Sequence, residues 1–315
     1  MSMNSSGKIV LLGGAGLVGQ NLTIKLIEAD YKNLLVVDKS QSNLAVLRQL
    51  HPEVSICCAD ISEDGEWAKL VGSQDTIVML QAQIGGLQLS EFERNNLLST
   101  RRVLEICKQE GITRIVHVSS SVVNSAADDF YTQTKTSQEN MVLESNMDSV
   151  ILRPTLMFGW FDRKHLGWLS RFMKKVPVFP IPGDGRYMRQ PLYVGDFADV
   201  LLSCIRDSSI SGIYDISGLE KIDYVDIIKA IRDETKSRAI VIKIPYKMFQ
   251  FLLNLWAKFD SNPPFTKQQL EALVTRDDFE VIDWPSIFQV SATPFRQAIQ
   301  ETFNHPSFSK VVLEF

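Results

Sequence analysis

The sequence predicts an α/β protein built on a doubly wound parallel sheet, with a smaller mixed α/β region toward the C-terminus. Almost wholly apolar segments of strand length, typical of buried parallel strands, lie at 8–12, 33–38, 54–60, 75–80, 114–120 and 149–154. Segments with helical character separate them, at 17–29, 42–50, 66–71, 87–110 and around Tyr131. Strands that alternate with helices are joined by crossovers of one hand, so we expect helices on both faces of the sheet.

The alternation ends at Pro154, and a different pattern follows. Residues 155–195 are rich in Gly, Pro and aromatic residues, which predicts loops around one short helix. After them we expect a mixed series of elements: helices at 196–206, 223–234 and 246–258, strands at 213–216 and 239–244, and short helices at 266–275 and 294–302. The chain therefore divides near residue 160, with residues around 190–218 expected to rejoin the core of the first unit.

Composition excludes several classes of function. The net charge is −4 and no block of basic residues occurs, so no nucleic-acid partner is expected. The four cysteines form no C-x-x-C pair and the four histidines lie far apart, so we expect no metal site and a reduced, cytoplasmic protein. The sequence has no run of about 18 apolar residues, so no membrane span is expected.

A glycine-rich turn, GGAGLVG at 13–19, follows the first strand and opens the first helix. Its G-x-G-x-x-G pattern permits a tight turn and a close approach of backbone to a pyrophosphate, whose charge is favoured at a helix N-terminus. A glycine-rich turn without a ligand is the alternative. The turn predicts a Rossmann-type NAD-binding domain at 1–160 and a mainly substrate-binding region at 161–315. The phosphate-site residues are Gly13, Gly16, Leu17, Val18 and Gly19.

Two carboxylates end the next two strands. Asp38 lies 19 residues after Gly19, where a carboxylate can accept hydrogen bonds from both ribose hydroxyls of an adenosine and repels a 2′-phosphate. This favours NAD(H) over NADP(H), although the neighbouring Lys39 weakens the preference. Asp60 is expected either to accept from the adenine amino group or to cap the following helix.

The segment DDFYTQTKTSQEN places Tyr131 four residues before Lys135, so the two side chains share one face of a helix. A phenol titrates near pH ~10 and is a poor base at neutral pH, but a nearby ammonium and a cationic nicotinamide both favour its ionised form. The strand at 114–120 ends at the same edge of the sheet, in a run of three serines. This set indicates proton transfer; a solvated helix face beside a serine-rich turn is the alternative.

Together these motifs resemble the extended and atypical short-chain dehydrogenase/reductase superfamily, and within it the NAD-dependent nucleotide-sugar epimerase/dehydratase family. The resemblance covers nearly the whole chain. It is carried by motifs in the same order and spacing: GGAGLVG at 13–19, Asp38, ADI at 59–61, NLLST at 96–100, VHVSSS at 116–121, Tyr131-x-x-x-Lys135, LRPTLMFG at 152–159, QPLYVGDFADVL at 190–201 and GIYDISG at 212–218.

The resemblance implies roles for single residues. Tyr131 is implied to be the general acid/base and Lys135 to bind the nicotinamide ribose. Ser121, and after it Ser120, is the hydroxyl expected to hold the reacting oxygen of the substrate. Further cofactor contacts are implied where strands end, at Asp60, Ile61, Gln81, Ala82, Ser119 and Pro154.

The resemblance also implies a substrate site and an assembly. Arg189, with Arg186 as the neighbouring alternative, is expected to bind the substrate diphosphate, because a guanidinium fork suits phosphate oxygens. The family commonly forms homodimers through two helices per subunit, which match residues 88–110 and 131–145 here.

Two departures from the family pattern narrow the expectation. Only ten residues lead from Ser121 to Tyr131, a short spacing that resembles the atypical subgroup, which includes the dehydrogenase-like accessory subunit of respiratory complex I. Val122 and Val123 stand where a 4,6-dehydratase has an acid and a base, and neither side chain can shuttle a proton. A dehydratase is therefore disfavoured.

The first hypothesis is an NAD(H)-dependent epimerase or reductase that acts on a nucleotide-activated sugar by hydride transfer. The alternatives are a non-catalytic nucleotide-binding protein that supports an assembly, and an NAD(P)-dependent dehydrogenase of a hydrophobic alcohol. The apolar segment at 246–259 is expected to pack in the core, with a pocket for a hydrophobic substrate or a contact with a membrane surface as the alternative.

Overall fold

The computed structural model describes residues 7–125, 127–256, 270 and 280–314. Its central element is a seven-stranded sheet in which every pair of neighbours is parallel, in the order β11-β6-β5-β4-β1-β2-β3. The predicted parallel sheet is confirmed. Its strands are β1 (Ile9–Leu12), β2 (Leu34–Asp38), β3 (Ser55–Cys58), β4 (Thr76–Met79), β5 (Arg114–Val118), β6 (Asp148–Pro154) and β11 (Gly212–Ile216).

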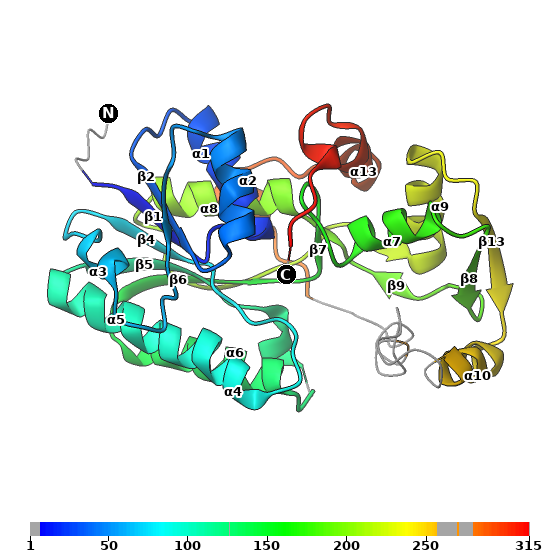
Figure 1. Ribbon diagram of the computed structural model, residues 1–315, viewed down its shortest axis with the longest axis horizontal. Helices are drawn as coiled ribbons and strands as arrows, with labels where there is room; N and C mark the ends of the chain where they lie inside the picture. Colours follow the sequence, from blue (N-terminus) through cyan, green and yellow to red (C-terminus); the bar gives the residue numbers. More distant parts are fainter. Residues whose placement is uncertain (1–6, 126, 257–269, 271–279, 315) are drawn as a thin grey trace.

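Helices cover both faces of this sheet, as a doubly wound fold requires (Figure 1). One face carries α1 (Leu17–Glu28), α2 (Gln41–Leu50) and α8 (Val194–Arg206). The other face carries α4 (Leu89–Phe92), α5 (Ser99–Glu110) and α6 (Phe130–Glu144), while the short α3 (Glu66–Lys69) precedes β4. The homodimer expected through residues 88–110 and 131–145 stays a prediction.

Alternate residues of each strand enter two separate cores. Leu11 and Val36 belong to the core beneath α1, α2 and α8. Val10 and Val37 belong to the opposite core, with Trp67 and side chains of α5 and α6. A strand buried on both faces carries apolar side chains on both, which explains the uninterrupted apolar segments of the sequence.

The long segment at 87–110 is helical from Leu89 onward and contains a wider turn. Helix α4 runs into a π-helical turn, η1 (Glu93–Leu98), and then into α5. In that turn the buried Asn96 accepts from the Gln83 N–H (2.7 Å) and donates to Thr134 Oγ1 (3.0 Å). The turn thereby links the loop after β4 to helix α6, and π turns of this kind are frequent at functional sites.

The expectation of loops around one helix at 155–195 is wrong in part. The helix is α7 (Leu166–Met173), but short strands also lie there: β7 (Met157–Phe158), β8 (Val178–Pro182), β9 (Met188–Arg189) and β10 (Leu192–Tyr193). Strand β7 pairs with β10, β8 with β13 (Ile240–Ile244) and β9 with β12 (Ile222–Asp223). Pairings between such distant, very short segments leave no periodic signal in the sequence.

The second half of the chain also contributes to the first unit. Strand β11 pairs with β6 at the edge of the large sheet, and α8 packs against α1. Helix α12 (Trp284–Phe288), which the sequence did not predict, joins the same core, where Trp284 Nε1 donates to Ser217 O (2.9 Å). The short helix predicted at 266–275 lies outside the described residues except at residue 270.

The C-terminal region has a core of its own. Side chains of α7, α9 (Tyr224–Glu234) and α13 (Phe295–Asn304) pack there against β8 and β10. Figure 1 shows this region beside the end of the large sheet, joined to it through β7 and the segment before α13.

Helix α10 (Tyr246–Trp256) contradicts the expectation of core packing. Its side chains Met248, Phe251, Leu252 and Leu255 are between 42% and 64% exposed. Residues 257–259 of the apolar segment lie outside the described residues. Among the helices described, none combines the length and the apolar character needed to cross a membrane.

Arg114 ties the start of β5 to the chain beyond α8. Its guanidinium donates to Ile210 O (2.7 Å) and to Asp148 (2.7 Å). It also donates to the carbonyls of Cys204, in the last turn of α8, and Asp207, just after α8. We predict that Arg114→Met lowers the free energy of unfolding by about 2 kcal/mol, because it leaves partly buried carbonyls without a donor. Urea unfolding followed by circular dichroism measures the change.

The matched control is Arg206→Met, at the exposed end of α8. We expect it to change the free energy of unfolding by less than about 0.5 kcal/mol. Equal losses in the two variants would contradict the role given to Arg114.

Candidate functional site

The turn between β1 and α1 has no room for side chains on its inner side. Gly13 has φ +72°, and a Cβ there would lie 2.6 Å from the backbone that follows β4; a Cβ on Gly19 would lie 2.1 Å from a carbonyl oxygen of the turn. Gly16 caps α1 without a side-chain hydrogen bond, and a Cβ there would be in ordinary contact with Gly13 O (3.9 Å). The first N–H groups of the helix, at Leu17 and Val18, have no partner within the helix, and the binding of a phosphate by them stays a prediction.

Asp38, at the end of β2, lies against this turn. Its carboxylate accepts from the N–H groups of Ala15 (3.0 Å) and Ser40 (2.9 Å). Burial raises the pKa of Asp38, and the two N–H groups oppose that rise. Each carboxylate oxygen of Asp38 can accept a further hydrogen bond in addition to these. The expected contact with the ribose hydroxyls of the cofactor stays a prediction.

Asp60 does not cap the next helix, because α3 begins after Gly65. Its carboxylate accepts from the N–H (2.9 Å) and the hydroxyl (2.6 Å) of Ser62 and pairs with Arg94 (3.0 Å). Burial raises the pKa of Asp60, but the Ser62 hydrogen bonds and the Arg94 charge outweigh burial and lower it overall. The contact with adenine stays a prediction.

The other predicted cofactor residues lie where strands end or just beyond. Ile61, Gln81, Ser119 and Pro154 are buried, whereas Ala82 is exposed. Gln81 also belongs to a buried hydrogen-bond network centred on Thr100, within the NLLST motif. The Thr100 hydroxyl accepts from Gln81 Nε2 (3.4 Å) and from Gln138 Nε2 on α6 (2.8 Å).

Tyr131 and Ser120 meet at the end of β5. Asp129 caps α6 by accepting from the Thr132 N–H (2.8 Å), which fixes the first turn that carries Tyr131. The Ser120 side chain lies close enough to the Tyr131 phenol to act on its pKa. Ser121, the first choice from the sequence, instead begins the short 3₁₀ helix η2 (Ser121–Asn124). Burial raises the pKa of Tyr131, the neighbouring Ser120 side chain opposes the rise and the Asp129 charge adds to it.

Lys135 is fully buried, one turn along α6 from Tyr131. Its Nζ donates to Val118 O (3.0 Å) and to Gln138 Oε1 (2.5 Å). Burial lowers the pKa of Lys135 to about 7, and the charge of Glu139 opposes the fall. Without a bound cofactor, the pKa of Tyr131 is therefore raised. The expected lowering of that pKa by Lys135 and a bound nicotinamide stays a prediction.

Sequence reasoning missed two buried groups beside Lys135. Glu139 is 4% exposed and accepts from Ser119 Oγ (2.6 Å). Its spacing from Lys135 is the same as that from Tyr131 to Lys135, so a third residue on this helix face could have been found by counting.

His117 on β5 is fully buried and neither ring nitrogen has a hydrogen-bond partner among the described residues. Burial and the Lys135 charge lower its pKa, so the ring is neutral.

The predicted substrate arginines lie on or beside the β9–β12 pair. Arg189 is partly buried opposite Ile222 and its charge acts on the buried Tyr224. Arg186 is exposed and lies 3.8 Å from Asp223. Both are therefore in the C-terminal region, and the contact with a diphosphate stays a prediction.

A basic pair that the sequence did not single out comes closer to the glycine turn. The charge of Asp38 raises the pKa of Arg163 against the larger lowering by burial. Lys164 Nζ lies 3.6 Å from the position that a Cβ on Gly85 would take, in the loop after β4. Burial lowers the pKa of Lys164 to about 8. Two adjacent cations are too common in sequences to have marked this loop.

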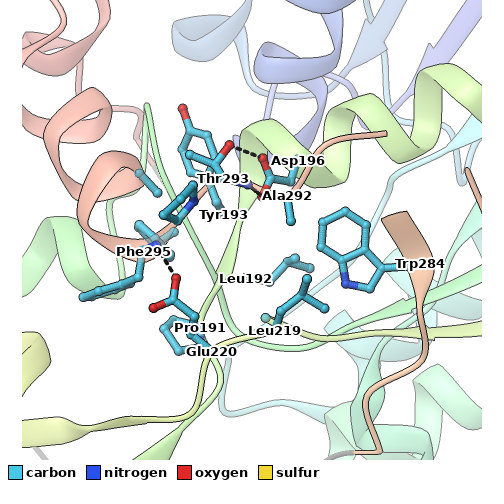
Figure 2. Close-up of a pocket in the computed structure, with 14 residues that line it drawn as sticks. Pro191, Leu192, Tyr193, Asp196, Leu219, Glu220, Trp284, Ala292, Thr293 and Phe295 are labelled. Carbon is cyan, nitrogen blue, oxygen red and sulfur yellow. Dashed lines mark hydrogen bonds between the residues drawn. The ribbon is translucent and has the colours of Figure 1, made fainter. Parts of the chain in front are cut away.

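A cavity of about 190 Å³ lies between the start of α8 and the segment before α13. Figure 2 shows its apolar walls, among them Leu192, Leu219 and Trp284. Its carboxylates are already engaged: Asp196 accepts from the hydroxyl (2.6 Å) and the N–H (2.9 Å) of Thr293, and Glu220 from the Phe295 N–H (2.6 Å). The described residues that line it include none of the predicted catalytic or cofactor residues, so this cavity is separate from the Ser120–Tyr131 site.

Curated relatives of the chain have different activities. It is 23% identical over 241 residues to the mitochondrial NADH dehydrogenase (ubiquinone) 1 alpha subcomplex subunit 9 of Arabidopsis thaliana, a match covering 75% of this chain and 60% of that protein. It is 29% identical over 185 residues to a 3-beta-hydroxysteroid dehydrogenase of Mycolicibacterium neoaurum, covering 50% and 49%. The chain thus spans about half the length of these relatives.

Solved structures share the fold over nearly the whole chain. The UDP-glucose 4-epimerase of Thermotoga maritima, with UDP-glucose, has a TM-score of 0.74 at 15% identity and covers 94% of this chain and 97% of its own. The UDP-glucuronic acid 4-epimerase of Bacillus cereus, with NAD, has a TM-score of 0.72 at 17% identity, covering 94% and 96%.

A family model decides the classification. The model of the NAD dependent epimerase/dehydratase family matches residues 9–217, more than half of the 315 residues. This confirms the predicted family and, because the family is NAD-dependent, the predicted NAD(H) cofactor. The protein belongs to the NAD-dependent epimerase/dehydratase family of Rossmann-type enzymes and their relatives.

Proposed function

We propose that this protein is an NAD(H)-dependent epimerase or reductase of a nucleotide-activated sugar, in which Tyr131 transfers the proton. The observation that carries the proposal is that Tyr131 lies on α6 one helical turn before the fully buried Lys135, with the Ser120 side chain close enough to act on the pKa of its phenol. A proton-transfer group must lie within hydrogen-bond reach of the reacting oxygen, and a paired phenol and hydroxyl can share one substrate oxygen between them.

The residues that suit the cofactor lie along the same edge of the sheet. The N–H groups after Gly16 would hold the pyrophosphate, and the Asp38 carboxylate would accept from the adenosine ribose. When bound, NAD supplies the hydride acceptor or donor. The protein's own side chains do the rest: Ser120 holds the sugar oxygen, and Tyr131 takes the proton from that oxygen or returns it.

Ser120 rather than Ser121 is the oxygen-binding serine in this proposal, because its side chain is the one that acts on the pKa of Tyr131. Val122 and Val123 follow in η2 and offer no proton-transfer group, which supports hydride transfer alone over a 4,6-dehydration. Arg189 is the proposed ligand of the substrate diphosphate.

The nucleotide-sugar class is supported by the structural neighbours, two of which are named as UDP-sugar epimerases. The relative named as a 3-beta-hydroxysteroid dehydrogenase favours a second candidate, oxidation of a hydrophobic alcohol. An alcohol without phosphate makes no use of Arg189, so the two candidates differ in whether that guanidinium affects substrate binding.

We predict that Tyr131→Phe lowers turnover by about 100-fold or more, because it removes the proton-transfer group and keeps the ring. Purified protein is incubated with NAD⁺ or NADH and a panel of UDP-, GDP- and dTDP-sugars and hydroxysteroids, and products are identified by mass spectrometry. Affinity for NADH, measured by its fluorescence, is expected to stay within about threefold.

The control for this variant is Tyr214→Phe, which removes a hydroxyl that donates to Ser211 O (3.0 Å) on the exposed end of β11. It is expected to keep the turnover of the unmodified protein. Full turnover in Tyr131→Phe would eliminate the catalytic proposal and favour a nucleotide-binding role without catalysis.

We predict that Asp38→Asn shifts cofactor preference toward NADP(H) by about tenfold in the ratio of dissociation constants. The amide keeps an acceptor for the Ala15 N–H but removes the charge that repels a 2′-phosphate. Fluorescence titrations with NADH and NADPH give the ratio.

Asp30→Asn serves as the comparison, since Asp30 is exposed beyond the end of α1 and its φ of 66° also suits Asn. No change in preference is expected there. If Asp38→Asn leaves the ratio unaltered as well, Asp38 does not face the adenosine ribose.

A further inference from the structure

Glu139 joins three segments that meet at the Tyr131 site. It lies on α6 one turn after Lys135 and is 4% exposed. One carboxylate oxygen accepts from Ser119 Oγ (2.6 Å) and from Arg153 Nε (3.0 Å), and the other accepts from Arg153 Nη2. A single carboxylate thus connects the helix to the ends of β5 and β6.

The partners of Glu139 stand next to predicted site residues. Ser119 precedes Ser120, whose side chain acts on the pKa of Tyr131, and Arg153 precedes Pro154 at the end of β6. The guanidinium of Arg153 also donates to Asn124 Oδ1 (3.2 Å) in η2 and lies 3.7 Å from an Asp215 oxygen on β11. A bidentate guanidinium–carboxylate contact fixes orientation as well as distance.

Lys135 is surrounded by neutral acceptors apart from Glu139. Its Nζ donates to a carbonyl and to an amide oxygen, and the neighbouring His117 on β5 is neutral. Glu139, one helical turn away, is the negative group that acts on it. Burial lowers the pKa of Lys135 to about 7 even though the Glu139 charge opposes the fall, so loss of that carboxylate would lower the pKa further.

We propose that Glu139 is a positioning residue of the site: it holds the strand ends that carry Ser120 and Pro154 against α6, and it keeps the buried Lys135 in its ammonium form. The proposal rests on the function proposed for Tyr131 and Lys135. Its consequence is that more of Lys135 carries a proton near neutral pH than would without the carboxylate, so that it can bind a ribose hydroxyl as donor and favour an ionised Tyr131.

A purely structural ion pair has a different consequence. If Glu139 served only to pair with Arg153, its removal would lower the free energy of unfolding but would leave the pKa of Lys135 unchanged. The titration midpoint of Lys135 therefore separates the two roles, and it requires no substrate.

The experiment is an NMR titration of the whole protein labelled with ¹³C at the Cε of lysine, with the Lys135 signal identified by its loss in Lys135→Arg. Glu139→Gln keeps the shape of the side chain and removes its charge. We expect the Lys135 midpoint to fall by roughly one pH unit in that variant, since a neighbouring opposite charge raises an amine's pKa by about that much or more. Glu139→Asp, which retains the charge, is expected to restore most of the difference.

Glu144→Gln is the matched control, because Glu144 lies on the same helix but is exposed. Its Lys135 midpoint is expected to match that of the unmodified protein. A folded Glu139→Gln protein with an unchanged midpoint would overturn the proposal.

Glu139→Gln removes the carboxylate that pairs with the half-buried Arg153, so the variant can fail to fold. The double variant Glu139→Gln with Arg153→Met removes both charges and keeps the test. Its midpoint is expected to lie below that of the unmodified protein, by less than in the single variant, because the opposing Arg153 charge is gone. A midpoint at or above the original overturns the proposal.

This outcome is independent of the Tyr131→Phe assay. If the Lys135 midpoint falls but Tyr131→Phe retains full turnover, the coupling stands and the proposed function fails. If turnover depends on Tyr131 but the midpoint does not move, the function stands and Glu139 has no positioning role.

Discussion

The site depends on one constraint, the parallel pairing of the central strands. Because β1, β2, β4, β5 and β6 run in the same direction, all of them end at one edge of the sheet. That edge collects the glycine turn, Asp38, Gln81, the serine run and Pro154, which are far apart in the sequence. Reversal of any one strand would move its terminal side chain to the opposite edge, so the chemistry of the site is inseparable from the sheet.

Burial of charge is the second feature that shapes the site. Lys135 and Glu139 are almost inaccessible to water, and removing charges from water is costly unless hydrogen bonds replace the lost hydration. The chain supplies those bonds from Val118, Gln138, Ser119 and Arg153. Such a network holds side chains in one arrangement, and it makes the protonation of Lys135 sensitive to a single neighbouring carboxylate.

Sequence patterns were sufficient where a residue type has one structural use. The apolar segments predicted the strands, and the glycine spacing predicted the turn before α1. The three adjacent serines were ranked with Ser121 first and Ser120 second, but which of them lies nearest Tyr131 depends on where β5 ends and η2 begins, which the sequence does not show. The pairs β7–β10 and β9–β12 involve two residues per strand, too few for periodicity. The apolar α10 was expected in the core, but an apolar sequence alone does not show what covers a helix.

The most direct measurement is a crystal structure of the protein with NAD⁺ and UDP. The account predicts a dinucleotide along the edge formed by the strand ends, with its ribose on Asp38 and its nicotinamide within about 4 Å of the Tyr131 hydroxyl, on the side where Ser120 lies. A dinucleotide bound elsewhere, or a nicotinamide separated from Tyr131 by more than about 8 Å, would contradict the account, because neither hydroxyl could then reach the oxygen that reacts.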